Sequence, residues 1–394
     1  MIREANIHHA ATIFEPHITN LEALRKIRAN TSCLLSVVGS IMTPEEAESL
    51  LEEGSADLIM LGRSTLADPF WPVKAQMGHS EDIVPCIRCL QCYHVSTDHK
   101  NVQCSVNPRF NREKRVPLIL PVTGHPKHLV IVGGGPAGIT CALTASRRGH
   151  QVTLLEKEPV LTGKLNIACH GEHKADLRRF RDYLLTQLRK SSVTVHTGVL
   201  ADTDVVRDLK PDALVIAVGA TPSRIPLPGV DGDNCIQISE FLQSPDTSLQ
   251  HYIIIGGGSV GCETALDLAE KGKDVSIIEM ADCLASASND LYRLALSEHF
   301  ARYDNLHTYL NSACQSIDAD GVNVLTNGAS THISGDKVLL SLGFRPDAKQ
   351  VSSLYGIVPD TYYVGDCERV ATVAEAVNNA YFIGANVFQE QDII

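Results

Sequence analysis

The sequence lacks any long apolar run. No stretch approaches the roughly eighteen residues that a helix needs to cross a bilayer, and no basic segment followed by an apolar run stands at Met1. We therefore expect a soluble protein without a membrane partner, located in the reducing cytoplasm, where cysteines stay free.

Basic residues are also scarce. The 34 Lys and Arg residues are outnumbered by 46 Asp and Glu residues, and the formal net charge is -12. A nucleic-acid-binding protein needs a basic stripe that replaces counterions along the phosphate backbone. The basic run at 109–115 is short and typical of a solvated linker. We expect no nucleic-acid partner.

Cysteine is plentiful, but closely spaced cysteines are confined to one segment. The chain of 394 residues has 12 cysteines in an ordinary globular composition, 44% hydrophobic and 20% charged, with room for two or three domains. Four of them cluster at 86–104. The other eight are scattered in apolar surroundings and are expected to be small buried hydrophobic side chains: Cys33, Cys141, Cys169, Cys235, Cys262, Cys283, Cys314 and Cys367.

Strand and helix signals alternate near the N-terminus. The runs at 33–39 and 56–63 predict short buried strands. Between them, 43–54 opens with Thr-Pro-Glu-Glu and ends in Gly, as a capped helix does. The pattern is typical of a βαβ unit in an α/β protein.

From 128 onward one pattern occurs twice. Each copy has an apolar strand that runs into G-x-G-x-x-G, then an alanine-rich helix, a polar turn and a second strand that ends in an acid. In the first copy Gly133 makes the tight turn and Gly135 lets the backbone approach a pyrophosphate. Gly138 allows the helix to pack on the strand, and Glu156 stands where a ribose hydroxyl would bind.

The second copy repeats these parts, so two dinucleotide sites are implied. The segment 212–229 closes the first unit before the second begins, and 362–387 predicts a strand and a helix that return to it. The sequence therefore predicts an α/β fold with two nested Rossmann-like dinucleotide-binding domains. The second fingerprint consists of Gly256, Gly258, Gly261 and Glu279.

This nesting resembles that of flavoproteins in which the outer unit holds FAD and the inserted unit holds NAD(P). The resemblance implies that Glu156 binds the adenine-side ribose of FAD and that Glu279 serves the nicotinamide cofactor. Asp366 would lie near the ribityl and phosphate region of the flavin. The other FAD-contacting positions that it implies are Pro136, Ala137, Gly163, Lys164, Leu165, Gly219 at the domain crossing, and Gly365.

Such flavoproteins often carry a redox disulfide beside the flavin. Here Cys141 and Cys262 each stand alone after their fingerprints, and no C-x-x-C occurs outside 86–92. A disulfide reductase is therefore not expected.

The clustered cysteines are spaced C-x2-C-x2-C-x11-C. Four thiolates suit either tetrahedral zinc or a [4Fe-4S] cluster, and the spacing alone leaves both open. A redox-inert ion has no evident task in front of an FAD unit, whereas a cluster can pass single electrons. This favours iron and sulfur, with four ligands: Cys86, Cys89, Cys92 and Cys104.

The segments V-V-G-S-I-M-T-P-E-E at 37–46, P-C-I-R-C-L-Q-C at 85–92 and C-S-V-N-P-R-F-N-R-E at 104–113, together with both fingerprints, carry a wider resemblance. They resemble the C-terminal part of the 2,4-dienoyl-CoA reductase and trimethylamine dehydrogenase group of the old yellow enzyme superfamily. In that group an FMN-bearing TIM barrel precedes the cluster and the FAD and NAD(P) domains. The resemblance implies that the four cysteines bind the cluster and that Gly39, Gly62 and Arg63 hold the FMN phosphate.

The sequence departs from this group in two places. A complete barrel needs about 200 residues or more, and only 1–84 precede the cysteines, enough for the last two strands. The group's substrate-binding and proton-donating residues are therefore missing, and no catalytic residue can be named. In addition, Gly163 and Lys164 stand where the group usually has a Gly-Gly-Gln turn.

We therefore expect four parts: an incomplete barrel, a cluster segment, an FAD domain in two pieces and an NAD(P) domain. The expected function is NADH oxidation, with electrons passing through FAD and the cluster to an FMN-type ene-reductase site that a partner subunit or self-association completes. Alternatives are a fragment or a shortened gene product, a stand-alone electron-transfer module that has lost FMN, an amine dehydrogenase subunit, and a nucleotide-binding scaffold. The parts are expected at 1–84, 85–127, 128–228 with 345–394, and 229–344.

NADH is the expected nicotinamide cofactor. Glu279 is followed by Met280, Ala281 and Asp282, so a 2′-phosphate would meet carboxylates and no arginine. NADPH should therefore be the poorer donor.

Overall fold

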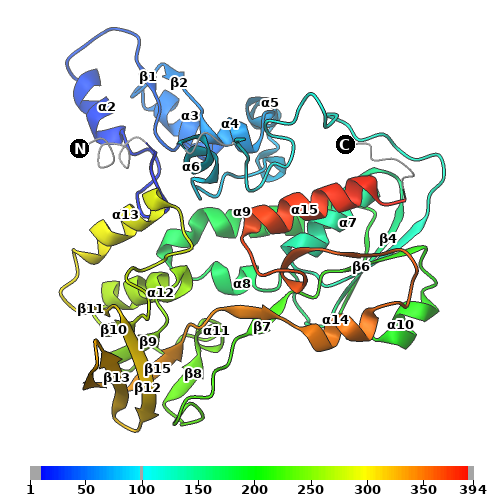
Figure 1. The fold of residues 1–394 in the computed structure, drawn as a ribbon. Helices are drawn as coiled ribbons and strands as arrows, with labels where there is room; N and C mark the ends of the chain where they lie inside the picture. The colour runs from blue at the N-terminus through cyan, green and yellow to red at the C-terminus, as the bar shows by residue number, and fades with distance from the viewer. Residues whose placement is uncertain (1–9, 98–100, 389–394) are drawn as a thin grey trace. The chain divides into compact units, whose positions relative to one another are not determined.

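The computed structural model describes residues 10–97 and 101–388. They form two compact units, each of mixed α/β structure (Figure 1). In the described part of the chain, no helix combines the length and apolar character needed to cross a membrane. The first unit comprises Met1–Asn166, Ala175–Ala220 and Pro346–Ile394, and the second comprises Ile167–Lys174 and Thr221–Arg345.

The N-terminal part of the first unit is built on a small parallel sheet. β1 (Ser36–Val37) pairs with β2 (Leu58–Ile59), and α3 (Pro44–Glu52) connects them, so the βαβ prediction is confirmed. Thr43 and Glu46 form a capping box that starts α3. The other elements here are α2 (Leu21–Arg28), α4 (Arg63–Ala67), α5 (Trp71–Gln76), the 3-10 helix η1 (Ser80–Asp82) and α6 (Gln91–Thr97).

A five-stranded parallel sheet organises the rest of the first unit, in the order β17-β6-β3-β4-β5. The strand and helix expected at 362–387 are present, and the strand joins this sheet beside β6. The sheet's strands are β3 (His128–Val132), β4 (Gln151–Glu156), β5 (Thr194–Thr197), β6 (Ala213–Ile216) and β17 (Thr361–Tyr363).

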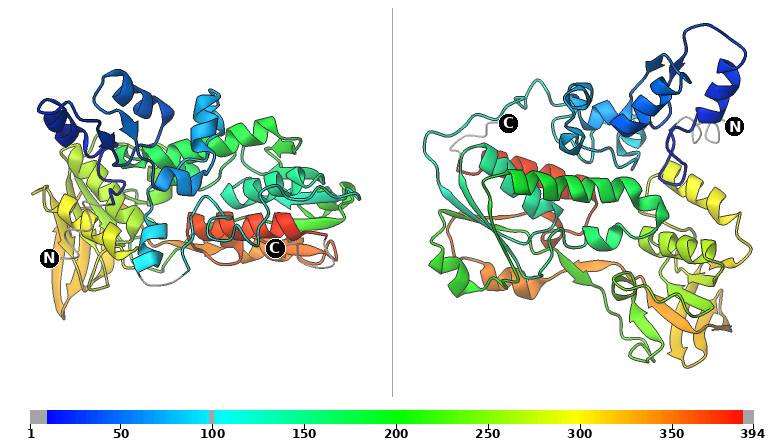
Figure 2. Two further views of the ribbon diagram at one scale, coloured as in Figure 1. Left: turned by 90° about the horizontal axis from the view of Figure 1, so that it is seen from above. Right: turned by 180° about the vertical axis from the view of Figure 1, so that it is seen from behind.

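Three helices, α7 (Pro136–Arg147), α9 (Ala175–Lys190) and α15 (Val373–Asn386), lie side by side along this sheet (Figure 2). A Cβ atom at Gly384 of α15 would lie 2.7 Å from the Cys141 carbonyl oxygen, so glycine permits the close approach of α15 to α7. The short helices α10 (Thr203–Asp208) and α14 (Ala348–Leu354) contribute Val206 and Leu354 to the core. The 3-10 helix η3 (Gly365–Cys367) precedes α15.

The second unit has a parallel sheet in the order β11-β10-β9-β15-β8 and an antiparallel sheet in the order β12-β13-β14. Apolar side chains of both sheets, including Ile253 and Val322, form one core. The strands are β8 (Cys235–Gln237), β9 (His251–Ile255), β10 (Asp274–Ile278), β11 (Leu306–Tyr309), β12 (Ser312–Asp318), β13 (Gly321–Thr326), β14 (Ala329–Ser334) and β15 (Lys337–Leu340).

The helices of the second unit are the 3-10 helix η2 (Glu172–Lys174), α11 (Ile238–Phe241), α12 (Ser259–Glu270) and α13 (Asp290–Phe300). Three elements lie where the chain passes between the units: α8 (Leu165–Ala168), β7 (Ala220–Pro222) and β16 (Phe344–Pro346). β7 and β16 pair with each other in a two-stranded sheet.

Candidate functional site

The first glycine fingerprint lies between β3 and α7. Gly133 has a φ of +114°, and a Cβ atom there would lie 2.2 Å from the Ala217 carbonyl oxygen, so this turn requires glycine. A Cβ atom at Gly138 would lie 1.9 Å from the Gly133 carbonyl oxygen. A Cβ atom at Gly135 would meet nothing within 4 Å, and no side chain caps α7 there. The first-turn N–H groups of α7 can therefore serve an approaching pyrophosphate.

Glu156 ends β4 and is buried beside this turn. Its carboxylate accepts hydrogen bonds from the N–H groups of Gly134, at 2.6 Å, and Glu158, at 2.9 Å. The acid thus stands at the edge of the fingerprint, and its bond to an adenine-side ribose stays a prediction.

The second fingerprint repeats this geometry between β9 and α12. Gly256 has a φ of +105°, and a Cβ atom at Gly261 would lie 2.2 Å from the Gly256 carbonyl oxygen. A Cβ atom at Gly258 would meet nothing within 4 Å, and no side chain caps α12. The carboxylate of Glu279 accepts a hydrogen bond from the Gly257 N–H at 2.6 Å. Both fingerprints therefore have the backbone opening that a pyrophosphate needs.

Two further segments of the first unit, which contain Gly163 and Gly365, lie against the first fingerprint. A Cβ atom at Gly365 would lie 2.9 Å from Ala137 Cβ, and one at Gly163 would lie 3.5 Å from Gly135 Cα. These contacts bring together positions that the sequence assigned to one FAD site from three distant segments.

Lys164 and Asp366 link the two segments that lie against the first fingerprint. The Lys164 ammonium forms an ion pair with the Asp366 carboxylate at 2.5 Å. Leu165 is buried next to Lys164, and Gly219 has a left-handed φ of +74°. Pro136 occupies the first turn of α7, where its missing N–H costs no hydrogen bond. The structure thus places a cation and a carboxylate beside the proposed flavin positions.

The four clustered cysteines line one pocket. Ser105 Oγ lies 3.1 Å from Cys89 Sγ, and the Arg88 N–H donates to Cys86 Sγ at 3.4 Å. The rest of the lining is mainly apolar. The pocket is bordered by Cys86, Cys89, Cys92 and Cys104 together with Arg63, Leu66, Ile87, Leu90, Ser105 and Val106.

Burial favours the protonated form of three of these thiols, Cys86, Cys92 and Cys104. It raises the pKa of Cys86 to about 12, although the positive charge of Arg63 opposes the shift. Burial also raises the pKa of Cys104 to about 12 and raises that of Cys92. Such thiols keep their protons at neutral pH until a bound metal centre displaces them.

Arg63 lies against the cysteine pocket as well as at the end of β2. Its guanidinium donates to a backbone carbonyl oxygen and to Ser40 Oγ, each at 2.7 Å. A Cβ atom at the neighbouring Gly62 would meet nothing within 4 Å, whereas a Cβ atom at Gly39 would lie 2.8 Å from Thr19 Oγ1. Of the two glycines predicted to hold an FMN phosphate, one is open and the other is covered.

An ionic network near the cysteine pocket was not anticipated. Asp176 pairs with Arg88 at 2.5 Å and with His17 at 3.1 Å, and His17 also pairs with Glu46. Burial lowers the pKa of His17, but Asp176 and Glu46 outweigh it and raise that pKa to about 8. Burial raises the pKa of Asp176, but His17 and Arg88 outweigh it and lower that pKa to about 2.

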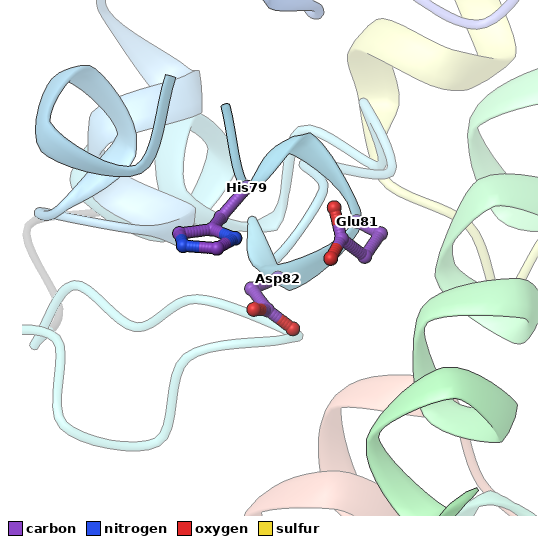
Figure 3. Close-up of side chains that lie close together, drawn as sticks. All are labelled: His79, Glu81 and Asp82. Carbon is purple, nitrogen blue, oxygen red and sulfur yellow. The ribbon is translucent and has the colours of Figure 1, made fainter. Parts of the chain in front are cut away.

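Three exposed or half-buried side chains in η1 and before it also come close together (Figure 3). The possible ligand atoms of His79, Glu81 and Asp82 lie within 4.8 Å of one another. Both carboxylates already pair with Lys190, at 2.8 and 2.7 Å, so we assign no metal site here. Across residues 10–97 and 101–388, no three sulfur atoms of the cysteine quartet form such a close group.

The scattered cysteines only partly follow the prediction. Cys33 is exposed, so the prediction is wrong there, because Cys33 lies in an exposed loop between α2 and β1. Burial raises the pKa values of Cys141 and Cys262 to about 12, which does not suit a redox-active thiolate. Cys235, Cys283 and Cys314 are half-buried, whereas Cys141, Cys169, Cys262 and Cys367 are buried as predicted.

Two family models match the chain. The model described as pyridine nucleotide-disulphide oxidoreductase matches residues 127–380, which include both fingerprints. The model described as NADH:flavin oxidoreductase / NADH oxidase family matches residues 1–82.

Three known proteins are similar over nearly the whole chain. An NADH oxidase of Thermoanaerobacter brockii is 33% identical over 411 residues, which cover 97% of this chain and 62% of the relative. A bilirubin reductase of Mediterraneibacter gnavus is 32% identical over 375 residues, which cover 95% of this chain and 58% of that relative. A solved structure of 2-naphthoyl-CoA reductase with 2-naphthoyl-CoA has a TM-score of 0.90 at 27% identity, covering 96% and 58%.

The chain spans about three fifths of the length of these proteins. The predicted resemblance to the 2,4-dienoyl-CoA reductase-like group is confirmed by both family matches and by these relatives. The chain belongs to the pyridine nucleotide-disulphide oxidoreductase family, whose members are nicotinamide-dependent flavin oxidoreductases.

Proposed function

We propose that the chain is the NADH-oxidising, electron-transferring part of an iron-sulfur flavoprotein reductase. The observation that carries this proposal is the presence of two open glycine fingerprints and a four-cysteine pocket in one chain. When bound, NADH supplies hydride to FAD, and a [4Fe-4S] cluster carries electrons singly toward an FMN site. The chain's own residues bind these groups and hold them apart from solvent.

In this proposal, residues 128–228 and 345–394 form the FAD-binding domain, and residues 229–344 form the nested Rossmann-like NAD-binding domain. The FAD assignment is supported by the contacts that join Gly163 and Gly365 to the first fingerprint. The Lys164–Asp366 pair would orient Asp366 toward the ribityl chain. Glu279 would bind the adenine-side ribose of NADH through the same geometry as Glu156.

The spacing of the thiols supports a cluster more than a zinc ion. A tetrahedral ion with metal–sulfur bonds of about 2.3 Å holds its ligand sulfurs about 3.8 Å apart. In the described chain, no three sulfur atoms of the quartet lie within 4.8 Å of one another. The quartet therefore lacks the close arrangement that a tetrahedral ion would impose, and four thiolates are also the ligand set of the proposed iron-sulfur core.

The first part, 1–84, would be the last βα units of a TIM barrel. Large apolar side chains around β1 and β2 are exposed, including Leu34 at 79%, Leu58 at 58% and Met60 at 54%. We propose that further parallel barrel strands cover this surface and complete the FMN site. The family match at residues 1–82 supports the barrel origin of this part. A partner chain would supply the missing strands.

The acceptor would be an activated double bond, as in an enoyl thioester, an enoate or an enone. Two of the similar proteins are named as reductases of bilirubin and of 2-naphthoyl-CoA. A second candidate is a stand-alone NADH:acceptor module without FMN. In this second candidate the chain would pass electrons from FAD and the cluster directly to an external acceptor.

Anaerobic purification followed by cofactor analysis tests the proposal. The expected protein holds one FAD and about four irons and four sulfides per chain, and NADH bleaches its flavin absorption. A flavin that NADH does not bleach would indicate a scaffold and contradict the proposed function. Stoichiometric zinc without iron or sulfide would contradict the cluster assignment.

A further inference from the structure

The loop that carries the first three cysteines is tied to α9. Arg88 lies between Cys86 and Cys89 and is 5% exposed. Its Nε donates to Asp176 Oδ2 at 2.5 Å, and its Nη1 donates to two backbone carbonyl oxygens of segment 12–15, at 2.7 Å each. The guanidinium thus fixes the cysteine loop to a helix that contributes no cysteine.

The loop needs such support because its backbone is strained. Arg88 and Leu90, on either side of Cys89, have left-handed φ values of +46° and +57°. Residues with a Cβ atom adopt this conformation only at a cost in free energy. Asp176, which is 1% exposed and also paired with His17, supplies a fixed anchor for Arg88.

The fourth cysteine is tied to α15. Asn378 is 7% exposed, and its side-chain amide donates to the Cys104 carbonyl oxygen at 3.1 Å. The same amide donates to the Ala374 carbonyl oxygen at 2.9 Å, and its oxygen accepts from Arg112 Nη1 at 3.0 Å. Both N–H groups and the oxygen of the Asn378 amide therefore have partners, which fixes the backbone at Cys104.

We propose that Asp176 and Asn378 are positioning residues that hold the two halves of the four-cysteine pocket, and so control how tightly its cluster is retained. The inference rests on the proposed function, since it requires a cluster. It goes further by making two helices of the flavin-binding part a component of the cluster site. Buried hydrogen bonds around metal ligands typically change metal affinity by 10- to 100-fold.

Asn378→Asp is the sharpest variant. Aspartate has the same shape and still accepts from Arg112, but it cannot donate to the Cys104 carbonyl oxygen. We expect at least tenfold faster loss of iron to a chelator and an altered electron paramagnetic resonance spectrum of the reduced cluster. FAD content should stay at the parental level. The neighbouring Asn379→Asp is the matched control, because Asn379 is exposed and gains the same charge.

Arg88→Gly tests the half of the four-cysteine pocket that contains Cys86, Cys89 and Cys92. Glycine adopts the left-handed backbone freely but removes the bond to Asp176. The proposal predicts at least tenfold faster iron loss here as well, with FAD retained. If only the backbone conformation mattered, Arg88→Gly would retain iron like the parent.

The outcomes separate the inference from the proposed function. A parent protein without iron and sulfide overturns the proposed function and this inference with it. A parent with a cluster, whose Asn378→Asp and Arg88→Gly variants keep parental iron retention and spectra, overturns this inference alone.

Discussion

At the residue scale, carboxylates make the contacts on which the proposed cofactor choice and the predicted local stability rest. Glu156 ends β4, Glu279 directly follows β10, and each accepts a fingerprint N–H in the same way. Asp176 instead anchors cations around the cysteine pocket. The first two were predicted from the sequence because their spacing from the glycines is local. Asp176 was not, because His17 lies 159 residues away along the chain.

Glu279 should make NADPH a poor donor. A 2′-phosphate placed beside this carboxylate and Asp282 meets like charge. A cost of about 1.4 kcal/mol in binding free energy already lowers the affinity tenfold. We expect FAD reduction at subsaturating cofactor to be at least tenfold slower with NADPH than with NADH. Glu279→Gln should narrow the difference without changing FAD content. Equal rates for the two cofactors in the parent protein would refute the role of Glu279.

His17 should make stability depend on pH. Its pKa rises from 6.5 to about 8 in the folded protein, so its stabilisation is full below pH 6.5 and is lost as pH rises through about 8. The shift corresponds to about 2 kcal/mol. Unfolding by urea at pH 6 and pH 9 should show this loss in the parent and little of it in His17→Gln. The same pH dependence in both proteins would contradict the assignment.

At the element scale, the repeated strand, turn and helix units carry the cofactor chemistry. Their positions were predictable because a glycine turn and an apolar strand are local signals. The antiparallel β12-β13-β14 sheet was not predicted. β14 is Ala-Ser-Thr-His-Ile-Ser and mostly exposed, so its hydrophobic periodicity is weak. The contacts of Gly163 and Gly365 with the first fingerprint also required the structure, because they join distant segments.

The glycines of the second fingerprint should respond differently to substitution. Gly258→Val adds a side chain into open space, so the protein should fold and hold FAD but lose NADH-driven bleaching. Gly261→Val would force a Cβ atom to 2.2 Å from the Gly256 carbonyl oxygen and should destabilise the second unit. Titration with NADH and thermal unfolding measure the two effects. Parental NADH affinity in Gly258→Val would contradict the proposed pyrophosphate approach.

At the scale of the whole molecule, the proposed incomplete barrel would decide which reaction is possible. The sequence predicted the two strands, but their predicted burial is wrong. Leu58 is 58% exposed and Met60 54%, because no further strand of the described chain pairs with β1 or β2. No substrate pocket was predicted, because the sequence offered no residues that could be assigned to one.

The isolated chain should hold FAD but little FMN. It should reduce artificial dyes with NADH and leave enoyl substrates unchanged until a chain carrying the remaining barrel strands is added. Flavin release followed by chromatography measures the FAD to FMN ratio. A full equivalent of FMN together with turnover of an unsaturated substrate by the chain alone would contradict the need for a partner.

The central claim is that electrons from NADH reach a cluster held by the four cysteines. The most direct measurement follows flavin and cluster absorption of the anaerobic protein after mixing with NADH, with electron paramagnetic resonance of the frozen product. The account predicts flavin bleaching followed by reduction of the cluster, and Cys89→Ser should lose the cluster signal while its FAD still bleaches. A parent protein in which NADH bleaches FAD and no iron-sulfur signal accompanies it would contradict the account.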